Sequence, residues 1–192
     1  MTILGVTASS ILKTPGAFES ISSVVSTGAS GTITFSSIPS TYRHLQIRCF
    51  GKSSLNLTGA DSVLMRFNSD TTSNYSVNIM RGYGSAVSRD RFGTRTNITL
   101  SQIAPYSATG TTNMFGAAII DIHNYAVTTQ IKTVRIACGS TMNSATTGNN
   151  GIDYESGEWN STAAISSISF VLNTGGVWVS GSTFSLYGIK GS

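Results

Sequence analysis

The chain has 192 residues, of which 40% are apolar and only 10% are charged, and its formal net charge is +4. This apolar content with so little charge excludes a disordered chain, because it can form a core. The small positive surplus does not by itself indicate a nucleic-acid partner, and no apolar run approaches the roughly 20 residues of a membrane helix. Serine and threonine together supply 56 residues, as is typical of extended strands and hydroxyl-rich loops.

The first residues differ from the rest of the chain. They have neither the alternation of a strand nor a helix cap, yet they include the apolar residues Ile3, Leu4, Val6, Ile11 and Leu12. Leaving all of these side chains in water would be unfavourable. We therefore expect residues 1–16 to form an extended arm that docks on another subunit, and residues 17–192 to form a single β-sandwich domain. No basic residues open the chain as they open a signal peptide, so we expect synthesis in the cytosol.

After the arm, apolar residues alternate with the period of two that a half-buried strand requires. Clusters of Gly, Asn, Asp and Ser separate these segments, with hairpin-type turn signals at Asn149-Asn150-Gly151 and Thr174-Gly175-Gly176. The pattern, with no capped helical periodicity, predicts an all-β protein, an antiparallel jelly-roll-like β-sandwich. The predicted strands are Phe18–Val25, Ile33–Phe35, Leu45–Phe50, Val63–Phe67, Tyr75–Met80, Phe115–Ile122, Ile131–Cys138, Ile152–Tyr154, Ile165–Leu172 and Phe184–Ile189.

Four arginine residues lie in the segment 81–95, which we interpret as a loop. This basic loop could bind an acidic protein partner, or it could be a solvated connection with an internal pair between an arginine and Asp90. Its cations are too few, and continue into no basic stripe, to favour nucleic acid. The candidate partner-binding residues are Arg81, Tyr83, Arg89, Arg91, Phe92 and Arg95.

The two cysteines, Cys49 and Cys138, each share a strand face with apolar neighbours, so both are expected to point into the core. A disulfide is possible if their strands are adjacent. Free thiols are favoured, because a protein made in a reducing cell rarely keeps a disulfide.

Three groupings contain residue types suited to chemistry. Asp121 and His123 share a strand face and could ligate a metal or belong to a triad, but without an evident third member a solvated or subunit-facing pair is favoured. Asp153 and Glu155 could be the paired acids of a glycoside hydrolase. The oxygen-rich loop 68–74 could hold calcium, although a hydrogen-bonded Asx turn is favoured. We expect no catalytic residue, no metal and no cofactor.

Several segments, in this order along the chain, together resemble one family. They are Gly5–Ser10, Phe35–Tyr42, His44–Arg48, Arg66–Tyr75, Phe115–Tyr125, Gly157–Ile168 and Phe184–Gly191. The family is that of small virion proteins of tailed bacteriophages, common in marine and cyanobacterial phages. The resemblance implies a non-enzymatic structural role in the virion after assembly in the host cytoplasm, and it carries over no catalytic residue.

Within that role, the first expectation is a capsid cement or decoration protein, fastened to the major capsid protein by its arm and forming a homotrimer, as phage jelly-roll accessory proteins usually do. The alternative is a tail fibre or baseplate module that binds host-surface glycans through exposed Trp159, Trp178 or Tyr187. For either tryptophan, a position in the core or in a subunit contact is favoured over a glycan contact. A glycan-cleaving enzyme using Asp153 and Glu155 is a distant third class. No membrane partner is expected.

Overall fold

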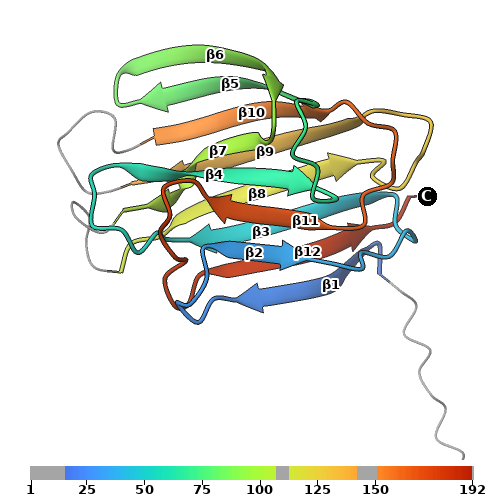
Figure 1. Ribbon diagram of the computed structural model, residues 1–192, viewed down its shortest axis with the longest axis horizontal. Helices are drawn as coiled ribbons and strands as arrows, with labels where there is room; N and C mark the ends of the chain where they lie inside the picture. The colour runs from blue at the N-terminus through green and yellow to red at the C-terminus, as the bar shows by residue number, and fades with distance from the viewer. Residues whose placement is uncertain (1–15, 107–112, 142–150, 192) are drawn as a thin grey trace, which may run out of the picture.

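The computed structural model describes residues 16–106, 113–141 and 151–191 (Figure 1). The predicted arm therefore lies outside the described residues, except for Gly16. In the described parts of the chain, no helix is long and apolar enough to cross a membrane. The strands are β1 (Phe18–Val25), β2 (Thr32–Phe35), β3 (His44–Gly51), β4 (Ala60–Phe67), β5 (Tyr75–Tyr83), β6 (Ala86–Arg95), β7 (Ile98–Pro105), β8 (Gly116–His123), β9 (Lys132–Ser140), β10 (Gly151–Trp159), β11 (Ile168–Leu172) and β12 (Thr183–Ile189).

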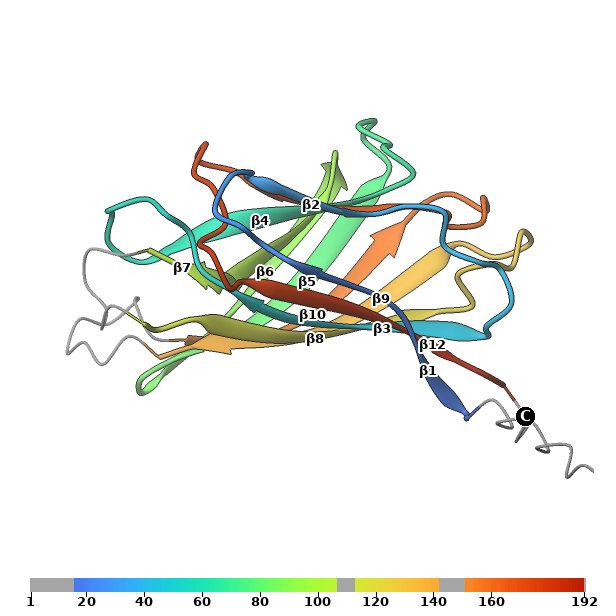
Figure 2. The same ribbon diagram turned by 90° about the horizontal axis from the view of Figure 1, so that it is seen from below.

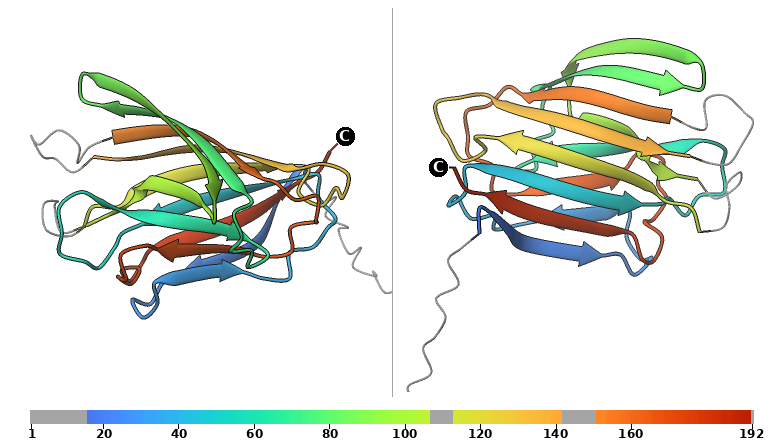
Figure 3. Two further views of the ribbon diagram at one scale, coloured as in Figure 1. Left: turned by 45° about the horizontal axis from the view of Figure 1, so that its top comes forward. Right: turned by 180° about the vertical axis from the view of Figure 1, so that it is seen from behind.

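These strands form two antiparallel sheets packed face to face, which confirms the predicted all-β sandwich (Figure 2). The large sheet has eight strands in the order β1-β12-β3-β8-β9-β10-β5-β6, and the small sheet has four in the order β2-β11-β4-β7. Because the large sheet has twice as many strands, the β5–β6 hairpin extends past the small sheet at one side (Figure 3).

The core lies between the sheets and follows from the alternation of the strands. One row of paired residues crosses four neighbouring strands of the large sheet with every side chain fully buried: Leu186, Ile47, Ile120 and Ile136. Phe170 of the small sheet lies 5.2 Å, centroid to centroid, from the ring of Phe184 in β12. Burying each such side chain stabilises the fold by about 1.5–3 kcal/mol, so this interior sets the register of both sheets.

The prediction that residues 81–95 form a loop is wrong. They make up the end of β5, a turn at Gly84–Ser85 and all of β6, with Gly84 supplying a φ of 55°. Strand β6 is an edge strand with most of its residues exposed. It therefore lacks the apolar alternation by which strands are recognised, and its charged residues protect the edge from pairing with another chain.

Three further elements differ from the sequence prediction. Strand β10 continues to Trp159, well past its predicted end at Tyr154. Strand β7 was missed, although it is almost wholly buried as an edge strand of the small sheet. Strand β11 begins at Ile168 rather than at Ile165. Ile165 is nevertheless buried, and its backbone N–H donates to the carbonyl of Tyr125 at 2.9 Å outside any strand. Ile165 therefore belongs to the core although it lies before the first residue of β11.

Both cysteines are buried and free, as expected. Cys49 pairs with Ala118, and Ala118 pairs with Cys138, so strand β8 separates the two thiols. Two strand spacings amount to about 9.6 Å, which is too far for a disulfide without moving the backbone.

Candidate functional site

The outer face of the large sheet, which the small sheet does not cover, changes from apolar to polar along its strands. The strand register places successive rows of side chains across β3, β8, β9, β10, β5 and β6. The row at one end is wholly apolar: Phe50, Ala117, Gly139, Ile152, Gly82 and Val87. The next row is apolar in its centre with an arginine at each end: Arg48, Ile119, Ala137, Tyr154, Met80 and Arg89.

The centre of these two rows is hollowed. Small residues between larger ones leave an open groove of about 650 Å³. Four of the larger side chains are far more exposed than is usual for their type: Val87 at 77%, Ile152 at 70%, Met80 at 56% and Tyr154 at 53%. We call this hollow the apolar groove and define it by Met80, Gly82, Val87, Ala117, Ile119, Ala137, Gly139, Ile152 and Tyr154.

Beyond the groove the outer face becomes polar. The third row consists of Gln46, Asp121, Arg135, Ser156, Asn78 and Arg91. The fourth contains His44, His123, Thr133, Glu158 and Ser76. Across these two rows and the ends of the second, four arginines stand beside two carboxylates. The groove is therefore an apolar surface with a predominantly positive rim, which favours an acidic counterpart.

The structure divides the predicted basic-loop residues between the two faces of the hairpin. Arg89 and Arg91 are exposed on the outer face beside the groove. Phe92 packs against the core, and the guanidinium of Arg95 lies 5.2 Å from the centroid of its ring. Arg81 points to the inner face, where it forms the internal pair with Asp90 at 3.0 Å. The six residues therefore do not form one basic surface.

Two of the three residues named for the glycan-binding alternative belong to the core, which was the favoured interpretation of both tryptophans. Trp159 and Trp178 are only 3% and 0% exposed, because both belong to the core, so neither can stack on a sugar. Tyr187 is half-buried on the outer face near the β1 edge. Its ring stacks on Phe18 at 4.8 Å, and the guanidinium of Arg48 lies 5.7 Å from the ring centroid.

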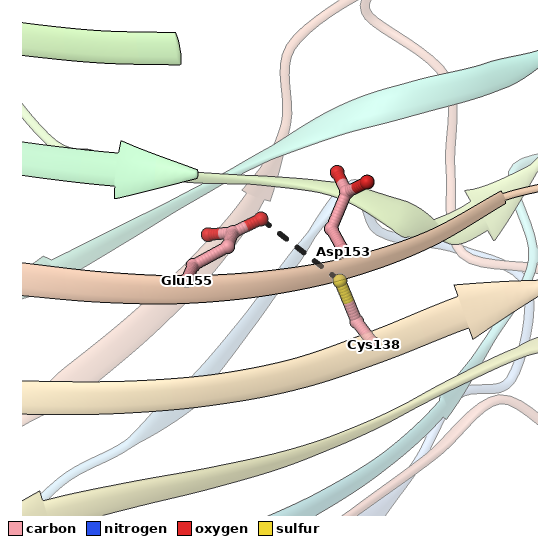
Figure 4. A group of neighbouring side chains, drawn as sticks. All are labelled: Cys138, Asp153 and Glu155. Atoms are coloured by element: carbon pink, nitrogen blue, oxygen red, sulfur yellow. Dashed lines mark hydrogen bonds between the residues drawn. The ribbon is translucent and has the colours of Figure 1, made fainter. Parts of the chain in front are cut away.

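Behind the groove, on the inner face of β9 and β10, lies a buried polar cluster (Figure 4). Cys138, Asp153 and Glu155 project toward the same side of the sheet, and each offers one ligand atom within 4.8 Å of the others. Asp153 and Glu155 are 2% and 0% exposed, and the Cys138 thiol lies 3.9 Å from Glu155 Oε1. Among the described residues this is the only group of three potential metal ligands of this kind.

Arg81 connects the cluster to its surroundings. Its Nε donates to Asp153 Oδ2 at 3.1 Å, and its Nη2 donates to the hydroxyl of Ser101 in β7 at 2.7 Å. Tyr83 lies nearby and accepts a hydrogen bond from the side-chain amide of Gln102 at 3.1 Å. Together with the Asp90 pair, these contacts attach the β5–β6 hairpin to both sheets.

Burial sets the protonation of the cluster. It raises the pKa of Glu155 to about 8, and the negative charge of Asp153 adds to the effect. Burial also raises the pKa of Asp153, although the attraction of Arg81 opposes this. The pKa of the Cys138 thiol is raised by burial and by the neighbouring carboxylates. Glu155 can therefore keep its proton near neutral pH, as an acid or base in a cleft could, but it faces the interior instead of the groove.

The structure also locates the other two groupings. Asp121 accepts a hydrogen bond from Gln46 Nε2 at 2.9 Å, and the ring of His123 lies edge-on to that of His44 at 5.1 Å, so the pair belongs to the polar end of the outer face. In the loop 68–74, the N–H of Thr72 donates to Asp70 Oδ1 at 2.8 Å, which confirms the predicted Asx turn.

Comparison of the chain with models of protein families, with curated proteins and with solved structures found no match.

Proposed function

We propose that the protein is a non-enzymatic structural component of a tailed-phage virion, a capsid cement or decoration protein that attaches to the major capsid protein. The resemblance of the chain to small phage virion proteins supports the location. The observation that best supports attachment to another protein is the apolar groove. Four large apolar side chains are exposed together there on one sheet face: Val87, Ile152, Met80 and Tyr154. Contiguous exposed apolar surface of this kind marks an interaction site on a protein.

The chemistry of the groove defines its partner. Removing this surface from water stabilises a complex by roughly 25 cal/mol per Å² of apolar area. Arg48 and Arg89 end the second row, and Arg91 and Arg135 follow in the third. An apolar protein surface rimmed by Asp and Glu satisfies both features. A second copy of the same face would bring these arginines together, so we assign the groove to another virion protein.

The groove also favours attachment over glycan binding. Its lining on the outer face is aliphatic apart from Tyr154 and offers few polar groups to orient a sugar. With both tryptophans in the core, only Tyr187 of the three candidate glycan contacts remains on the outer face.

Two parts of the proposal rest on the sequence. The arm residues Ile3, Leu4, Val6, Ile11 and Leu12 supply a second contact with the shell, and the protein forms a homotrimer. In a trimer, lateral contacts would cover some of the sheet edges.

The composition of purified virions tests the proposed function. Quantitative mass spectrometry of gradient-purified particles of the phage that encodes the chain should find it in a copy number comparable to that of the major capsid protein. A few copies per particle would move it to the tail. Its absence from particles, with the protein present in infected cells, would contradict a virion role.

A further inference from the structure

We propose that Cys138, Asp153 and Glu155 form a binding site for a divalent transition-metal ion of the zinc type, buried between β7 and the large sheet. The sequence predicted no metal, because Cys138 is distant in the chain from the two acids. Strand pairing places Cys138 directly opposite Asp153, and Glu155 follows two residues later on the same face. The three ligand atoms lie within 4.8 Å of one another, whereas tetrahedral zinc ligands lie roughly 3.5 Å apart. Side-chain shifts of about 1 Å would close the site.

Two buried oxygen atoms without a hydrogen-bond partner are a second indication of a bound ligand, independent of the spacing of the three ligand atoms. Asp153 Oδ1 and Glu155 Oε2 are buried and accept no hydrogen bond. A buried carboxylate oxygen without a partner is unfavourable by several kcal/mol when it is ionised, so such atoms normally have a proton, a donor or a metal beside them. Arg81 satisfies only the other oxygen of Asp153, at 3.1 Å. Each acid therefore keeps one buried oxygen atom that is available to coordinate a metal ion.

The local charge favours a divalent cation. With Cys138 as the thiolate and the other groups ionised, Cys138, Asp90, Asp153 and Glu155 carry four negative charges, and Arg81 carries one positive charge. A divalent ion would offset two of the three remaining negative charges. A thiol sulfur with carboxylate oxygens suits zinc or cobalt, whereas calcium and magnesium prefer oxygen alone. On binding, the Cys138 thiol releases its proton to solvent and coordinates as the thiolate. Three protein ligands leave a fourth position on a tetrahedral ion.

Cobalt(II) is the probe that tests the site, because a bound thiolate produces a sulfur-to-cobalt charge-transfer absorption. We expect the reduced, full-length protein to bind one equivalent of cobalt with this absorption, and we expect zinc to displace the cobalt. Cys138→Ser should lose the absorption. Cys49→Ser is the matched control, because it removes the other buried cysteine of the same sheet. It should keep the absorption.

Glu155→Gln provides a second variant, since it preserves shape while removing a charged ligand. It should weaken cobalt and zinc affinity by at least about tenfold, as lost metal-site partners do. If Cys138→Ser does not fold, as judged by circular dichroism, this variant decides the question. Absence of the absorption in the unaltered protein, an unchanged absorption in a folded Cys138→Ser variant, or unchanged affinity in Glu155→Gln would overturn the metal site and leave a proton as its occupant. None of these results bears on whether the protein is found in particles.

Discussion

Asp153 and Tyr154 are adjacent in β10, yet their side chains lie on opposite faces of the large sheet. Asp153 is 2% exposed and pairs with Arg81 inside the sandwich, whereas Tyr154 is 53% exposed in the apolar groove. The same three strands, β9, β10 and β5, thus support the buried cluster on one face and the groove on the other. Substitutions on each face should therefore have separable effects, on stability for the inner face and on attachment for the outer face.

Replacing Arg81 with methionine should destabilise the fold strongly. The change leaves Asp153 buried without its ion partner, and breaking a buried pair in this way costs about 3–5 kcal/mol of unfolding free energy. Arg91→Met, at an exposed position of the same hairpin, should change stability by no more than about 0.5 kcal/mol. Urea unfolding followed by tryptophan fluorescence measures both. Equal stability of the two variants would show that the Arg81 ion pair does not hold the hairpin.

Glu155 should make the metal-free protein less stable as the pH rises. Its pKa is about 8 in the folded protein, against 4.5 ordinarily. Between these values the folded state keeps a proton that the unfolded state has lost, so the unfolding free energy falls by up to about 1.4 kcal/mol per pH unit. The raised pKa of Asp153 acts in the same direction.

Glu155→Gln isolates this contribution, because glutamine does not titrate. In the presence of a chelator, unfolding curves collected between pH 5 and pH 8 should show a shallower decline for the variant. An identical pH dependence for the two proteins would mean that Glu155 is ionised throughout and that its surroundings differ from those described.

Removing the carboxylate of Asp70 should loosen the loop around Trp159. Hydrogen bonds from Thr72, Trp159 and Asn74 outweigh the effect of burial and lower the pKa of Asp70 to about 2. Asp70→Ala leaves the Trp159 indole N–H, now bonded at 2.8 Å, without this acceptor. We expect a loss of about 1–3 kcal/mol in chemical denaturation. Ser73→Ala, at an exposed position of the same loop, is the control.

Whether the sequence predicts a strand depends on how that strand is buried, because only a strand with one buried apolar face shows a clear alternation of apolar and polar residues. Strands with one apolar face were found close to their true bounds, and β1 has the predicted limits, Phe18–Val25. Strand β6 was missed because most of its residues are exposed and its one inward apolar residue, Phe92, lies among charged residues. The spacing of Asp153 and Glu155 also identified them as a pair on a strand. The approach of Cys138 could not be predicted, because it depends on which strands pair and in which register.

The apolar groove escaped prediction for a related reason. Its exposed residues Ile119, Tyr154, Met80 and Val87 come from four different strands, and each strand supplies only one or two of the exposed large side chains. Scattered exposed apolar residues are normal on protein surfaces. Only the strand order β8-β9-β10-β5-β6 makes them neighbours.

The oligomeric state can be measured directly. Multi-angle light scattering of the purified protein at micromolar concentration should give three times the chain mass of 20.1 kDa. A monomer across this range would contradict the proposed trimer, and a dimer would redirect attention to two-fold contacts between sheet edges.

The arm can be tested by truncation. A chain that begins at Gly16 keeps the described sandwich and lacks the apolar residues of the arm. It should bind less tightly than the full chain to particles assembled without this protein, because the arm is the proposed second contact. Equal binding would leave attachment to the groove alone.

The most direct test of the central claim compares two charges placed on the outer face of β10. Ile152 is 70% exposed in the groove, and Ser156 is exposed on the same face at the polar end, so glutamate at either position should change stability by no more than about 0.5 kcal/mol. Binding of Ile152→Glu to particles lacking the protein should fall by about tenfold or more, as at an interface hot spot, whereas Ser156→Glu should bind like the unaltered chain. Unchanged binding of a correctly folded Ile152→Glu variant would contradict attachment through the apolar groove.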